Sequence, residues 1–91
     1  MARTTGTRSL ADLVAQGVLK PNEEIVVNRR SAPRIEAVVT RHGLIEVHGR
    51  LFNTPSAAAK EVLNVGSVDG WLRWRVPRLG GKSLAELRDN G

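Results

Sequence analysis

The chain has 91 residues, of which 41% are hydrophobic and 25% charged, and it has no cysteine. These values predict one globular domain and exclude a disulfide framework or a thiolate metal site. Fourteen Lys and Arg against nine Asp and Glu give a net charge of +5, and most of the cations are arginine. Because the planar arginine side chain suits phosphates and base edges, this balance favours a nucleic-acid partner, although small basic domains also bind acidic proteins.

The amino-terminal residues 1–8 are polar and basic and contain Arg3 and Arg8. They lack the apolar segment of a signal peptide, and no apolar run in the chain approaches the roughly 20 residues that span a bilayer. We therefore expect residues 1–8 to form a flexible basic arm and residues 9–91 to form a single cytoplasmic domain with no membrane partner.

A short capped helix is predicted near each end of the chain. In SLADLVAQG, Ser9 is a suitable N-cap and Asp12 is placed to bond back to it. SLAELRDNG repeats the arrangement with Ser83 and Glu86. A duplicated unit would explain the similarity, but nothing between the two segments repeats. The same capping pattern used twice is therefore the preferred interpretation.

The part of the chain between these helices has β character. Alternation at 34–40 predicts a half-buried strand, and 24–30, 44–48 and 50–53 are further candidates. The short glycine-containing connections at 41–43 and 48–49 are typical of hairpins. The expected fold is therefore α+β, with a small antiparallel meander of three or four strands packed with three short helices.

The third helix is expected at TPSAAAKEVLN. Thr54 is a suitable N-cap, and Pro55 suits the first turn. The small residues at 57–59 would allow a neighbouring element to approach closely. Because the helix dipole favours anions, the amino end of this helix is also a candidate phosphate site.

WLRWRV, at 71–76, is expected to be a final short strand. Period-two alternation would place Trp71, Arg73 and Arg75 on one face and Trp74 on the other. Trp74 would then belong to the core. Two interpretations of Trp71 stay open, a stacking platform for a base, or a ring packed beneath a loop against its own arginines.

Motifs for catalysis are weak. GGKS resembles the end of a phosphate-binding Walker loop, but Val76 stands where that motif needs its first glycine. His42 and His48 would lie about 20 Å apart at opposite ends of one strand, too far for one metal ion. We therefore expect no catalysis, no metal and no cofactor.

Four segments, taken in order, resemble the RAMA family (restriction enzyme and adenine methyltransferase associated). They are SLADLVAQGVLKPNEEI, IEVHGRLFNTPSAAAKEV, VDGWLRWRV and SLAELR. The family pattern has an opening L-x-x-L-x-x-G-x-L helix, an SPS-x-A-A segment, an N-G-W-x-x-W box and a closing L-x-x-L-R. The resemblance covers residues 9–88. It implies a compact α+β DNA-binding module of restriction or modification systems, in some members for DNA with methylated adenine.

The resemblance also implies site residues. The family positions fall on Ser56, Asp69, Gly70, Trp71 and Arg88. Asp69 departs from the pattern, because the family box has asparagine there. Asparagine can both donate and accept at an adenine edge, whereas aspartate only accepts, so the departure bears on base specificity more than on binding.

The expected function is non-catalytic DNA binding, as a reader of methylated adenine or as the DNA clamp of a restriction–modification system at the nucleoid. The alternatives are modification-independent binding of duplex or single-stranded DNA, and a protein-interaction module. The expected partners are DNA, methylated or not, and a methyltransferase or nuclease. Trp71 is expected to contact a base or methyl group. The full set of expected DNA-contacting residues is Arg50, Ser56, Lys60, Asp69, Gly70, Trp71, Arg73, Arg75 and Arg88.

Overall fold

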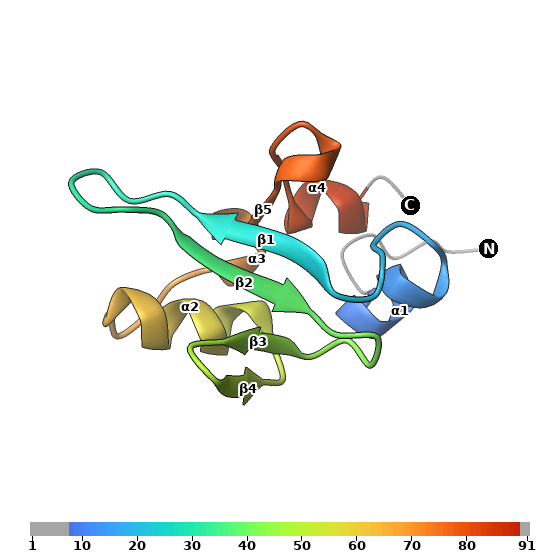
Figure 1. Ribbon diagram of the computed structural model, residues 1–91, viewed down its shortest axis with the longest axis horizontal. Coiled ribbons are helices and arrows are strands. Elements are labelled where there is room, and N and C mark those ends of the chain that lie inside the picture. Colours follow the sequence, from blue (N-terminus) through green and yellow to red (C-terminus); the bar gives the residue numbers. More distant parts are fainter. Residues whose placement is uncertain (1–7, 90–91) are drawn as a thin grey trace.

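A computed structural model describes residues 8–89, which form one antiparallel sheet and four helices (Figure 1). The strands are β1 Glu23–Val27, β2 Ile35–Val39, β3 Ile45–Val47, β4 Arg50–Phe52, β5 Arg75–Val76 and β6 Lys82–Ser83. The helices are α1 Leu10–Ala15, α2 Pro55–Leu63, α3 Gly70–Arg73 and α4 Leu84–Asp89, with a 3₁₀ turn, η1, at Pro77–Leu79. The strand order is β4-β3-β2-β1-β5-β6. Among the described residues, no helix has the length and apolarity needed to cross a membrane.

The predicted α+β class is confirmed, but the sheet has six strands rather than three or four. Outside the predicted meander lie β5, which is the end of the strand predicted at 71–76, and β6; they contain two residues each and pair as a small hairpin. Strands this short carry no periodic pattern, so alternation could not reveal both of them. The fourth helix, α3, was also absent from the prediction, because its residues were assigned to the last strand.

The predicted strand at 71–76 is wrong over most of its length. The chain is helical from Gly70 to Arg73 and becomes a strand only at Arg75–Val76. Asp69 caps the helix, since its carboxylate accepts a hydrogen bond of 3.0 Å from the Trp71 backbone N–H. An aspartate in this position stabilises a helix start, so local capping overrides the apparent alternation.

The predicted helix caps are confirmed. Ser9 and Asp12 form a complete capping box on α1, with side chain to backbone bonds of 3.0 and 3.1 Å. Ser83 and Glu86 form a second one on α4, with bonds of 2.9 and 3.2 Å. Thr54 caps α2 by accepting a bond from the backbone N–H of Ala57. Each cap satisfies amide groups that a helix end leaves without an internal partner.

The predicted hairpin at 48–49 is also confirmed. β3 and β4 pair with Val47 opposite Arg50, which leaves a two-residue turn. Both turn residues have positive φ, 53° at His48 and 77° at Gly49. This is the turn geometry that matches the right-handed twist of two paired strands.

The core lies between one face of the sheet and the helices. Trp74 is fully buried in it, which confirms its predicted role. The opposite face of β1–β3 carries exposed glutamates and is covered by none of the described helices (Figure 1). The core residues include Leu10, Leu13, Ile25, Val27, Ile35, Val39, Ile45, Ala58, Ala59, Trp74, Val76 and Leu84.

A very close contact joins α3 to the amino end of α2. A Cβ atom on Gly70 would lie 2.2 Å from the carbonyl carbon of Pro55. The Gly70 N–H donates to the Ser56 Oγ at 2.9 Å. The indole N–H of Trp74 donates to the Pro55 carbonyl oxygen, also at 2.9 Å. The two helices are therefore fixed by backbone proximity together with two hydrogen bonds.

An ion pair between a buried carboxylate, Glu23, and a more exposed arginine, Arg78, fixes η1 against the start of β1. The Glu23 side chain is only 5% exposed and bonds to Arg78 at 2.7 Å. The guanidinium also donates to the Val18 carbonyl, and the Lys20 backbone N–H donates to Glu23. Burial acts to raise the pKa of Glu23, but the Arg78 and Lys20 hydrogen bonds and charges outweigh it and lower that pKa.

Replacing Glu23 by glutamine should lower the free energy of unfolding by about 1–3 kcal/mol at neutral pH, because the charge-assisted bonds to Arg78 are lost. The folded-state pKa lies below the ordinary value of 4.5, so this contribution is complete above that pH and disappears as the pH falls through the folded-state pKa. Urea unfolding at several pH values measures the effect. The exposed neighbour Glu24→Gln is the control, and a difference that persists unchanged in acid would contradict the assignment.

Replacing Gly70 by alanine should destabilise the protein by about 3 kcal/mol, because the new methyl group would meet backbone atoms that cannot move aside. The matched control is Gly66→Ala, since a Cβ at Gly66 has nothing within 4 Å and its φ is not positive. Thermal unfolding of both variants measures the effect. Equal melting temperatures would show that the α2–α3 contact is less tight than described.

Candidate nucleic-acid interface

The residues predicted to contact DNA fall into two groups in the structure. Those of the first group are buried or partly buried and take part in contacts within the fold. Those of the second group have exposed side chains. The first group is Ser56, Gly70, Trp71 and Arg88, and the second is Arg50, Lys60, Asp69, Arg73 and Arg75.

Trp71 is partly buried and packs against the core. The guanidinium carbon of Arg88, in α4, lies 4.1 Å from the centre of its ring. The predicted partners Arg73 and Arg75 do not share a strand face with it, because the chain is helical at Trp71. Of the two interpretations left open, the structure contains the packed ring stacked on an arginine of the same chain. That contact covers one face of the indole, and the residue as a whole is still partly exposed.

The amino end of α2, predicted as a phosphate site, is occupied by the protein itself. Gly70 approaches so closely that a Cβ there would lie 2.4 Å from the Ser56 nitrogen. The Ala57 N–H already donates to the Thr54 hydroxyl. Pro55 has no N–H to offer. The amide groups of this first turn are therefore either covered by α3 or already hydrogen-bonded, and a phosphate would have to displace α3 to reach them.

The exposed cations differ in how strongly they are engaged. Arg50 forms a 3.0 Å ion pair with Glu61, and both side chains are more than half exposed. One Arg75 nitrogen donates to the Gly81 carbonyl at 3.1 Å. Lys60 and Arg73 are exposed. Exposed ion pairs contribute little and rearrange readily, so all four side chains can still reach a phosphate.

Arg8, the last residue of the predicted flexible arm, is anchored to the fold. Its guanidinium donates to the Leu87 carbonyl at 2.6 Å and to the Arg88 carbonyl at 3.0 Å, and a further nitrogen bonds to the Gln16 side chain. A cation in this position satisfies the carbonyl groups that the carboxyl end of α4 leaves without an internal partner and neutralises their partial negative charge. Arg3 and the rest of residues 1–7 lie outside the described residues.

The loop between β1 and β2 is a basic element that the sequence analysis missed. All seven residues at 28–34 are exposed, and they contain Arg29, Arg30 and Arg34 but no acidic residue. In Figure 1 the loop extends beyond the rest of the domain at one end. The signal was present in NRRSAPR, a basic run around a proline between two strands. Arg29 and Arg30 were instead assigned to the end of the strand predicted at 24–30, and Arg34 to the start of the one predicted at 34–40.

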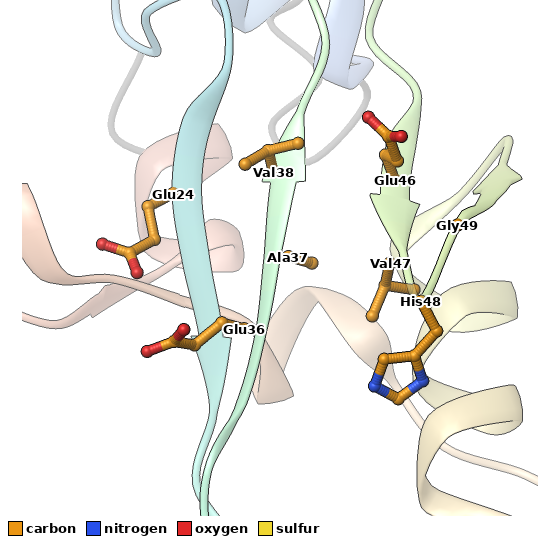
Figure 2. A pocket seen from close by; sticks show the side chains of 8 residues that line it. All are labelled: Glu24, Glu36, Ala37, Val38, Glu46, Val47, His48 and Gly49. Carbon is orange, nitrogen blue, oxygen red and sulfur yellow. The ribbon is translucent and has the colours of Figure 1, made fainter.

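The outer face of the sheet has the opposite charge. An open hollow of about 400 Å³ lies there, lined by Glu24, Glu36 and Glu46 around Val38, with His48 at its rim (Figure 2). Register places Val38 between Glu24 and Glu46 on neighbouring strands. Among the described residues, no group of three His, Cys, Asp or Glu side chains is arranged to hold a metal ion. The three carboxylates would repel a polyanion, whereas the neighbouring 28–34 loop is basic, with Arg34 and Glu36 in contact at 3.4 Å where the two meet.

Comparison with known proteins agrees with the motif pattern. The family model described as Restriction Enzyme Adenine Methylase Associated (RAMA) matches residues 1–90, nearly the whole chain. No curated protein gives a significant match. The resemblance carried by the opening helix, the DGW box (Asp69, Gly70 and Trp71) and the closing helix is thereby confirmed. The chain belongs to the RAMA family, whose name associates it with restriction enzymes and adenine methylases.

Proposed function

We propose that this domain binds duplex DNA as a non-catalytic part of a restriction–modification system, working in the cytoplasm at the nucleoid. The observation that carries the proposal is the separation of charge. Carboxylates gather on the outer face of β1–β3, while exposed arginines lie on the 28–34 loop and at positions 73 and 75, toward the β5–β6 end of the sheet. A polyanion is attracted to one part of such a surface and repelled from the other. The family association supplies the biological setting.

Phosphates would be bound by the exposed cations that have no strong internal partner. Arg75 lies on β5 directly opposite Val26, one residue before the end of β1. Arg73 precedes it on the same segment, and Lys60 lies in the last turn of α2. Such contacts position the protein on DNA without reading its sequence, and they make affinity strongly dependent on salt.

We further propose that the DGW box contacts a methylated adenine. Asp69 is exposed and lies two residues before the partly exposed Trp71; one of its carboxylate oxygens accepts from the Trp71 backbone N–H, and the other is an available acceptor. An adenine methylated on its exocyclic nitrogen keeps one N–H to donate and gains an apolar group, so an acceptor beside an indole suits it. The Ser56 hydroxyl accepts from Gly70 and retains its own hydrogen as a donor.

The variant Asp69→Asn tests both parts of this proposal. Asparagine is as good an N-cap as aspartate, so the fold should be unchanged. Removing a negative charge near phosphates should tighten binding to duplex DNA, by roughly threefold at low salt. The control Glu46→Gln removes the same charge from the outer sheet face and should change affinity much less.

The measurement is fluorescence anisotropy with methylated, unmethylated and single-stranded forms of one DNA sequence, at two salt concentrations. Tighter binding of the methylated duplex, altered by Asp69→Asn but not by Glu46→Gln, is the expected result. Equal affinity for both duplexes would remove the reader function and leave modification-independent binding. Absence of binding to every DNA would remove DNA binding itself and favour a protein-interaction role.

A further inference from the structure

We propose that the hairpin formed by β1 and β2 enters the major groove of duplex DNA, with the arginines of its loop as the contacting residues. This inference rests on the DNA-binding function proposed above and adds to it the element that contacts the groove. The arginines concerned, Arg29, Arg30 and Arg34, belong neither to the DGW box nor to the closing helix.

The hairpin has the reach that groove insertion needs. Strand pairing ends at Val27 opposite Ile35, and the next seven residues are all exposed. With a rise of roughly 3.3 Å per residue, the tip of such a loop stands about 10 Å beyond the last strand pair. The major groove is about 8.5 Å deep and about 12 Å wide, which admits a two-stranded β-ribbon. Figure 1 shows that no other element stands beside the tip.

The loop is built to hold its shape while leaving its charge available. The Arg29 Nε donates to the Pro33 carbonyl at 2.9 Å, which closes the loop from one arm to the other. Arg34 forms only a 3.4 Å contact with Glu36, and both side chains are more than half exposed. Arg30, nearest the tip, has no hydrogen bond or ion pair with any residue that the structure describes. Ordering the loop in advance lowers the entropy that binding would otherwise cost.

The surroundings of the hairpin fix the direction from which DNA can approach. Beside the base of the hairpin, Val26 is flanked by Glu36 on β2 and by Arg75 on β5. Beyond Glu36 the outer sheet face is acidic, so DNA laid across that face would be repelled. An approach at the tip keeps the backbone of the DNA near Arg30 and brings Arg75, on the β5 side, toward a flanking phosphate.

The variant Arg30→Ala tests the assignment, and Arg41→Ala is its matched control. Arg41 is an exposed arginine in the turn at the opposite end of β2, so the net charge changes equally in both variants. Arg30→Ala should weaken duplex binding roughly tenfold, while Arg41→Ala stays within about twofold of the wild type. If Arg30 contacts a phosphate, the slope of log affinity against log salt should also fall by about 0.9. Unchanged thermal unfolding confirms that both variants are folded.

Competition with small DNA ligands assigns the groove. Methyl green, which occupies the major groove, should displace the wild-type protein, and netropsin, which occupies the minor groove, should not. The inference is overturned if Arg30→Ala and Arg41→Ala bind equally well, or if netropsin competes and methyl green does not. In either case wild-type binding would still support the proposed function. A wild-type protein that binds no duplex at low salt would overturn both.

Discussion

The contact between Gly70 and the backbone of Pro55 and Ser56 is the constraint on which the carboxyl-terminal half of the fold depends. It admits no side chain at position 70, and it is locked by the bond from the Trp74 indole to the Pro55 carbonyl. Once α3 is fixed there, the chain leaves Trp74 in an extended conformation and places β5 beside β1. The DGWLRW segment thus combines a cap, a close helix contact and a core residue, and it holds the Trp71 ring, partly buried, between the core and Arg88.

The sequence predicted well what is decided locally. The capping boxes of Ser9 and Ser83 and the two-residue turn at His48 depend on neighbouring residues alone, and all are present. The strand assigned to 71–76 failed because alternation in so short a segment fits a helix equally well. Asp69 caps the helix locally, and the fit of Gly70 against Pro55, fifteen positions earlier, adds a tertiary contact that no local pattern reports.

The candidate site was predictable only in part for the same reason. Trp71 and Asp69 could be found from the DGW box, but the sequence could not show that Arg88 would cover one face of the indole. It also could not show that α3 would cover the amino end of α2. The loop at 28–34 was missed because a basic run at a strand end becomes conspicuous only when the sheet is seen to stop before it.

The net charge of +5 therefore does not measure the charge that DNA would meet. Three arginines hold the fold together: Arg8 at the end of α4, Arg78 on the buried Glu23, and Arg88 on Trp71. Each of these guanidinium groups interacts with carbonyl groups, a carboxylate or an aromatic ring, so breaking the interaction would destabilise the fold. The arginines at 28–34 make no contact with the core. Even Arg34 contacts only an exposed carboxylate, at 3.4 Å. A polyanion would meet the exposed arginines that the fold does not need, and three of these lie together on the projecting β1–β2 hairpin.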